Sequence, residues 1–215
     1  MASIPLKPQY RPTLAQMLSP RWHGLPRVSR ALVILAGLGV LALAIGLALT
    51  LQRASVSHGS PVPFSFEYRG LYRTPPPAGQ YTRVARSTDG RLEESFTVGP
   101  LLLPAYEGSL SAELPLYAAS YIRALAGRYQ RFDLLGEGKT RVSTVPGYQV
   151  LYSATIEGRR MYGRDVLLAP ERMGARRGVD IVMLASPEGD RRLESAAEVA
   201  GEGPLNTALH TFSFG

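Results

Sequence analysis

An uninterrupted apolar stretch from Ala31 to Leu51 constrains this chain more than any other feature. Its 21 residues carry no charge, and Thr50 has the most polar side chain among them. A helix rises about 1.5 Å per residue, so this stretch would span about 32 Å, which is enough for the hydrocarbon core of a bilayer. We therefore expect a transmembrane helix over residues 31–51, preceded by a tail of residues 1–30.

The positive charge of the chain is concentrated in that tail. The formal net charge is +7, yet residues 1–30 hold five basic residues and no acidic residue, which leaves 19 basic and 17 acidic residues elsewhere. Cationic residues beside a membrane helix favour the cytoplasmic side. We expect a single-pass plasma-membrane protein with a cytoplasmic N-terminus and a C-terminal domain outside. The near-neutral remainder argues against nucleic-acid binding.

Two alternatives concern the apolar stretch itself. A cleaved signal peptide would have an apolar region of about 7–15 residues, so the longer stretch here favours an uncleaved signal anchor. Small residues at Ala42 and Gly46, and at Ala44 and Ala48, could let two such helices approach closely. A homodimer through these positions is left open.

The absence of cysteine removes several kinds of chemistry. Disulfides, thiolate nucleophiles, cysteine-ligated zinc and a lipid anchor on cysteine are all excluded. Arginine outnumbers lysine by 22 to 2, and Asn206 is the only asparagine. We interpret this bias as that of a GC-rich bacterial genome.

Residues 63–215 follow a polar tether, residues 52–62, and are numerous enough to form one domain with its own core. Period-two alternation predicts strands, and apolar residues at helical spacing from Ser111 to Gly127 predict a helix. We expect strands at Phe64–Tyr68, Tyr81–Arg86, Leu92–Val98, Phe132–Leu135, Lys139–Val145, Tyr148–Ile156, Arg160–Leu168 and Val179–Ala185.

Three further segments complete the expected domain. Gly99–Gly108, which carries a Leu101-Leu-Leu run, is expected to be an exposed loop, while Leu193–Val199 and Pro204–His210 are expected to be helical. This order predicts an α+β fold, with helices packed on a mostly antiparallel sheet.

The C-terminal part of the chain also resembles the PsbP-like superfamily, which includes the mycobacterial LpqN-type lipoproteins. The resemblance covers roughly 100 residues from Ala112 onward. It consists of the helix, Gly136-Glu-Gly-Lys-Thr-Arg-Val, Pro146-Gly-Tyr-Gln-Val-Leu-Tyr, a Glu157-Gly hairpin, a strand and a C-terminal helix. The resemblance implies an α/β sandwich used as a non-catalytic accessory domain. Those lipoproteins are anchored through a cysteine, which this chain lacks.

Catalytic chemistry in the domain would depend on one histidine, because only His210 lies within residues 63–215. A histidine metal cluster needs more than one such side chain. A Ser-His-Asp hydrolase would need His210 with Asp133, Asp165 or Asp180 as the orienting carboxylate, and no Gly-x-Ser-x-Gly elbow accompanies it. We expect no catalytic, metal or cofactor site, and keep a hydrolase using His210 as an alternative.

Two sets of side chains are candidates for binding. Three arginine pairs fall at expected turns or loops and could contact a partner or an anionic ligand: Arg159 and Arg160, Arg176 and Arg177, and Arg191 and Arg192. Three tyrosines at strand positions could line a groove: Tyr148, Tyr152 and Tyr162.

These observations favour a membrane-anchored, extracytoplasmic binding or accessory module of a bacterial cell envelope. Its expected partners are the lipid bilayer, through residues 31–51, and an envelope protein or an anionic envelope component. Besides the hydrolase, a second alternative is a sensor that couples the outer domain to a cytoplasmic partner of the tail.

Overall fold

The computed structural model describes residues 26, 32, 35–42, 53–170, 176–189 and 192–215. The chain divides into two units, residues 1–51 and residues 52–215, and each is considered by itself. In the first unit, residue 32 and residues 35–42 are helical. Within the described residues, no helix combines the length and the hydropathy needed to cross a membrane. Most of the expected segment 31–51, including Ala44, Gly46 and Ala48, lies outside the described residues.

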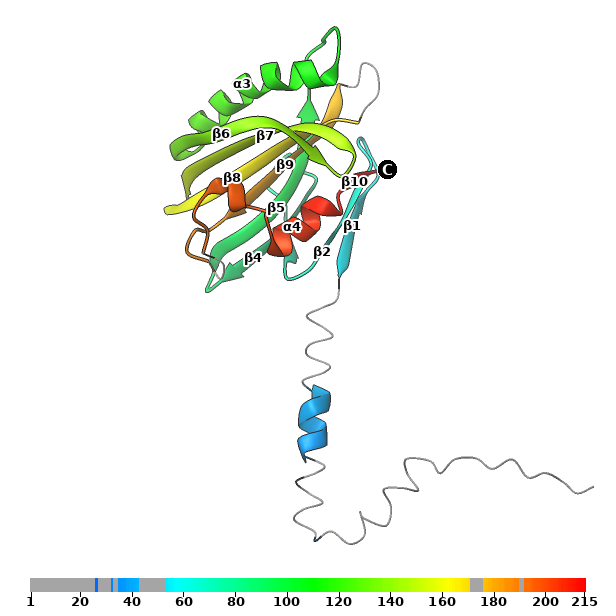
Figure 1. Cartoon of the computed structure of the whole chain (residues 1–215), viewed down its shortest axis with the longest axis vertical. Coiled ribbons are helices and arrows are strands. Elements are labelled where there is room, and N and C mark those ends of the chain that lie inside the picture. Colours follow the sequence, from blue (N-terminus) through cyan, green and yellow to red (C-terminus); the bar gives the residue numbers. More distant parts are fainter. Residues whose placement is uncertain (1–25, 27–31, 33–34, 43–52, 171–175, 190–191) are drawn as a thin grey trace, which may run out of the picture. The chain divides into compact units, whose positions relative to one another are not determined.

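A large antiparallel sheet forms the frame of the second unit (Figure 1). Each strand pairs with its neighbour in antiparallel register. Within the described part of the chain, the sheet has seven strands, in the order β3 (Tyr72–Thr74), β4 (Thr82–Thr88), β5 (Arg91–Leu102), β9 (Arg177–Ala185), β8 (Arg159–Leu168), β7 (Val145–Ile156) and β6 (Gln130–Val142).

One face of this sheet packs against a smaller sheet and the C-terminal helix. The smaller sheet has the order β1 (Ala54–His58), β2 (Phe64–Tyr68) and β10 (Ser213–Phe214). After β9, the chain forms a 3-10 turn, η1 (Ala196–Glu198), and the helix α4 (Gly203–His210) before it ends in β10. The main core lies between these layers. It joins Phe64 and Phe66 of β2 to Phe96 of β5, Ile181 of β9 and Leu205 of α4.

The other face carries α3 (Leu110–Arg128), which lies over β6 and β7 (Figure 1). Its buried residues, Leu114, Ala118 and Leu125, recur at helical spacing and turn one stripe of the helix toward the sheet. Successive side chains of a strand point to opposite faces. Ile181 and Met183 of β9 therefore join the main core, whereas Val182 lies on the face that carries α3.

The structure confirms the α+β class, the antiparallel pairing and the helix expected from Ser111. It also joins the two strands expected at Phe132–Leu135 and Lys139–Val145 into β6. The register of β6 against β7 shifts between Leu134 and Gly136, so the strand has a bulge there, and Gly136 and Gly138 are paired within the strand rather than forming a turn.

Three expectations were wrong in their detail. Residues 54–58, assigned to a tether, form β1, whose Val56 is buried in the main core. The expected loop at Gly99–Gly108 begins only after Leu102, because β5 continues and buries Leu101 beneath α3. In Leu193–Val199 only η1 is helical.

Candidate functional site

Two buried carboxyl groups lie beneath α3. Asp165 of β8 and Asp180 of β9 are 0% and 8% exposed. Asp165 is opposite Val182 in the register of these strands, and Asp180 precedes Val182 by two positions. The two carboxyl groups are therefore diagonal neighbours on the same face of the sheet.

Two tyrosine hydroxyls connect this pair. The Tyr121 hydroxyl, from α3, lies 2.6 Å from Asp165 Oδ2 and 2.8 Å from Asp180 Oδ2. The Tyr152 hydroxyl, from β7, donates to Asp165 Oδ1 over 3.1 Å. The ring of Tyr152 is fully buried and stacks on Tyr129, with 5.9 Å between the ring centroids.

The hydrogen count of this cluster favours a proton shared by the carboxyl pair. A phenol can donate only one hydrogen bond, yet Tyr121 lies within hydrogen-bonding distance of two carboxyl groups. If Tyr121 donates to one carboxylate, the other must be protonated and donate to the Tyr121 oxygen. The pair therefore carries one proton between its two members, as close buried carboxyl groups do.

The electrostatics of the cluster agree with this count. Burial raises the pKa of Asp180 to about 7, although the Tyr121 hydrogen bond and the Arg128 charge act in the opposite direction. Burial and the neighbouring charge of Asp180 raise the pKa of Asp165 well above its usual range. Burial and the two carboxylates also raise the pKa of Tyr121, so its hydroxyl stays protonated.

One oxygen of the pair has no partner. Among the described residues, no group forms a hydrogen bond to the buried Asp180 Oδ1. Gly99 of β5 stands opposite Asp180, and the side-chain amide of Gln80 occupies the space that a Cβ at Gly99 would fill. Gln80 therefore covers the sheet next to the carboxyl pair.

A groove of about 250 Å³ opens beside this cluster, on the part of the sheet that α3 does not cover. One row of paired residues crosses the groove: Arg83 of β4 is opposite Thr97 of β5, which is opposite Val182 of β9. The groove is lined by Pro77, Gln80, Arg83, Leu92, Ser95, Thr97, Arg128, Tyr129, Ile156, Glu157, Val182 and Leu184.

A second cavity, of about 480 Å³, adjoins the groove through three shared residues, Leu92, Ile156 and Glu157. It adds Gly90, Arg91, Arg159 and Met161 to the lining. The two hollows follow the ends of the β4–β5 and β7–β8 hairpins. Together they form the candidate binding surface of the domain.

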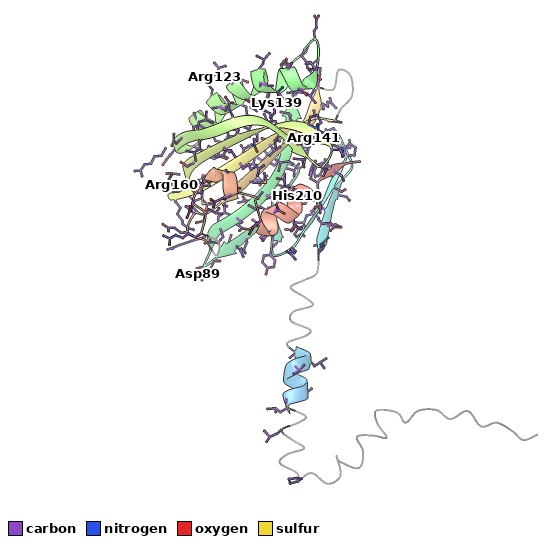
Figure 2. All side chains as sticks on the ribbon, in the orientation of Figure 1. Asp89, Arg123, Lys139, Arg141, Arg160 and His210 are labelled. Atoms are coloured by element: carbon purple, nitrogen blue, oxygen red, sulfur yellow. The ribbon has the colours of Figure 1, made fainter. Side chains whose placement is uncertain are left out.

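The structure separates the predicted arginine pairs. Arg159 and Arg160 begin β8, whereas Arg177 begins β9, which runs antiparallel to it, so the two pairs lie at opposite ends of the sheet. Arg159 contacts Glu93 across 3.8 Å, and Arg160 lies 5.3 Å from the ring centre of Tyr162. Figure 2 labels Arg160 at this end.

The other two arginine pairs add little to this surface. Arg176 donates from its Nε to the Leu103 carbonyl, next to the start of β9. The backbone of Arg192 forms an isolated antiparallel β-bridge with that of Glu188, and Arg191 lies outside the described residues. Of the five arginines in these pairs that the structure describes, only Arg159 lines the candidate surface.

The predicted tyrosine groove is likewise divided between two faces. Tyr148 and Tyr152 lie on the face beneath α3, and Tyr152 belongs to the carboxyl cluster. Tyr162 points to the other face, where its hydroxyl donates to the Glu194 carbonyl. These three side chains do not form one groove, and none of them lines the groove beside α3.

His210 is remote from the carboxyl pair. It is exposed in the last turn of α4, as labelled in Figure 2, whereas Asp165 and Asp180 lie on the opposite face of the large sheet. The arrangement does not bring His210 together with these two candidate orienting residues. Within the described residues, no group of three or more His, Asp or Glu side chains is arranged to hold a metal ion.

Sequence reasoning named Asp165 and Asp180 only as partners of His210 and missed their pairing. A signal was present, because each aspartate directly precedes a run of apolar residues within a predicted strand. A carboxyl group beside such a run must find hydrogen-bond partners or keep its proton.

No protein-family model and no curated protein matches the chain. A solved structure of LpqN from Mycobacterium tuberculosis, a protein involved in cell envelope biogenesis, is similar at 13% identity and a TM-score of 0.42; the match covers 76% of this chain and 90% of LpqN. PA94 from Pseudomonas aeruginosa, a protein of unknown function, is similar at 16% identity and a TM-score of 0.35, over 63% of this chain and 84% of its own.

Proposed function

We propose that this chain is a membrane-anchored binding module of a bacterial cell envelope, without catalytic activity. Residues 31–51 would cross the plasma membrane with the N-terminus in the cytoplasm. The domain of residues 52–215 would then bind an envelope component outside the membrane, in the groove beside α3.

The groove is the observation that supports a binding role. Binding sites are concave, with apolar surface and a small number of polar groups that fix orientation. Here Val182 and Leu184 supply the apolar part, and the hydroxyls of Ser95 and Thr97 lie between them and β4. The hydroxyl of Tyr129 and the side chain of Arg128 add further polar groups to the lining.

The anchor is supported by the sequence. The apolar stretch has the length of a bilayer span, and the tail that precedes it holds five basic residues and no acidic residue. The sequence from Ala112 onward also resembles the PsbP-like superfamily, and this resemblance agrees with an accessory role.

Retention of a small molecule by the full chain tests this function. The protein is purified from the membranes of its native bacterium in mild detergent and analysed by native mass spectrometry. Ile156→Trp places a large ring at the half-buried rim of the groove, and Leu116→Trp places the same ring on the outside of α3, where Leu116 is 71% exposed. We expect the bound mass to be present in the wild type and in Leu116→Trp, and to be lost in Ile156→Trp.

The same bound mass in both tryptophan variants would contradict binding in the groove. A wild-type protein that retains no small molecule under these conditions would also count against the proposal. Protease protection of the C-terminal domain in intact cells tests its location, and cleavage from the cytoplasmic side only would contradict an extracytoplasmic domain.

A further inference from the structure

We infer that the groove beside α3 takes an organic anion with a short apolar body. This inference rests on the proposed binding function and adds the chemical class of the ligand. The geometry points to an anionic head held by Arg83 and Arg128 from opposite walls, and to an apolar body lying toward Leu92 and Ile156.

The charges that face the groove favour an anion. The groove and the adjoining cavity are lined by four arginines, Arg83, Arg91, Arg128 and Arg159, and by one carboxylate, Glu157. Arginine binds carboxylate and phosphate groups through paired hydrogen bonds, and a partly enclosed site strengthens such bonds.

Two of these arginines can turn toward a ligand, although Arg128 also shares a side-chain hydrogen bond with Tyr129. Within the described residues, neither Arg83 nor Arg128 forms an ion pair, whereas Arg159 has Glu93 at 3.8 Å. Arg83 is half-buried on β4, and Arg128 is exposed at the last residue of α3. A ligand held between them would neutralise both guanidinium groups.

Two negative groups near the groove would repel an anionic ligand, but the structure reduces the effect of both. Glu157 is exposed in the β7–β8 turn, at the end of the groove away from Arg83. The carboxyl pair beside the groove shares one proton, because Tyr121 bridges its two members. These groups therefore do not cancel the positive charge of the walls.

The floor and the far end of the groove provide the apolar contacts. Val182 and Leu184 form part of the floor, and Leu92 and Ile156 stand where the groove meets the second cavity. The hydroxyls of Ser95 and Thr97 lie on β5, opposite Leu184 and Val182 in register. An apolar body therefore finds its contacts beyond the arginines.

The size of the groove limits the ligand. A volume of about 250 Å³ equals that of about eight water molecules at ~30 Å³ each. A head group with a chain of about six carbons fills such a space, and the second cavity leaves room for extension. We therefore choose hexyl phosphate as the test ligand.

Isothermal titration calorimetry of the full chain tests the inference directly. The protein is reconstituted in nanodiscs of uncharged phosphatidylcholine, and heats from empty nanodiscs are subtracted. Four probes are compared: hexyl phosphate, hexanol, hexylammonium and inorganic phosphate. We expect hexyl phosphate to bind at least about tenfold more tightly than each of the others, because only this probe uses both the arginines and the apolar surface.

Variants of the two arginines locate the binding. Arg83→Gln and Arg128→Gln should each weaken the binding of hexyl phosphate by about fivefold to tenfold. Arg123→Gln is the matched control, because Arg123 is an exposed arginine of the same helix as Arg128 and lines neither hollow. Its affinity for hexyl phosphate should equal that of the wild type.

Equal or tighter binding of hexanol or hexylammonium would overturn the anion inference and leave the groove as a binding site. If no probe binds but Ile156→Trp still loses the native bound mass, the ligand class alone is wrong. If no probe binds and Ile156→Trp keeps that mass, both the ligand class and the proposed function are refuted.

Discussion

Replacing Asp180 with asparagine is predicted to remove a large part of the pH dependence of folding. Asparagine has nearly the same shape, and its amide can either accept from or donate to the Tyr121 hydroxyl, which lies 2.8 Å from Asp180 Oδ2. It cannot ionise. Asp180→Asn therefore mimics the protonated form of the pair at every pH.

The magnitude follows from the raised pKa of Asp180, about 7 in the folded chain against an ordinary value of 3.8. Between these two values the folded chain holds a proton that the unfolded chain has lost, so stability falls as the pH rises. From pH 5 to pH 7 this loss is about 2 kcal/mol, since each pH unit corresponds to at most ~1.4 kcal/mol. That is a sizeable share of a typical domain stability of about 5–15 kcal/mol.

Urea denaturation of the full chain, followed by circular dichroism at pH 5 and pH 7, measures this effect. The free-energy difference between the two pH values should be about 2 kcal/mol smaller in Asp180→Asn than in the wild type. Asp89→Asn is the control, because Asp89 is exposed in the β4–β5 turn, with a positive φ of 52° that asparagine also tolerates (Figure 2). An unchanged pH dependence in Asp180→Asn would refute the shared proton.

Two further substitutions probe the same face of the sheet. Tyr121→Phe removes the hydroxyl between Asp165 and Asp180, and should lower the free energy of unfolding at pH 7 by about 1–3 kcal/mol in urea denaturation; an unchanged value would contradict the bridging role. Gly163→Ala places a methyl group against the ring of Tyr152 and should lower the free energy of unfolding by about 1–3 kcal/mol in the same measurement. Gly138→Ala places its methyl group in open space and should leave the free energy of unfolding unchanged. Equal effects of the two alanines would show that the ring can move away.

Much of the fold could be predicted from local patterns. Tyr148–Ile156 alternates cleanly and forms most of β7, and apolar residues at helical spacing identify α3. The missed strand β1 has only one buried residue, Val56, so it carries no alternation to detect. It forms because β2 offers an edge with which to pair, which is a tertiary cause.

The candidate site was harder to predict. The groove joins residues around Gln80, the end of α3 and the β7–β8 turn, which only the strand order brings together. The arginine pairs were chosen because they are adjacent in sequence, but antiparallel β8 and β9 carry Arg159 and Arg177 to opposite ends. Arg83 and Arg128 are single arginines without a local signal, and their shared groove emerges from the fold.

The location of the natural ligand tests the central claim most directly. A photo-reactive benzoylphenylalanine replaces Ile156 at the groove or Leu116 on the outside of α3, and the full chain is irradiated in living cells of its native bacterium. The account predicts that intact-mass spectrometry finds a small-molecule adduct at position 156 and none at position 116. Equal adducts at both positions, or none at position 156, would contradict a ligand-binding groove beside α3.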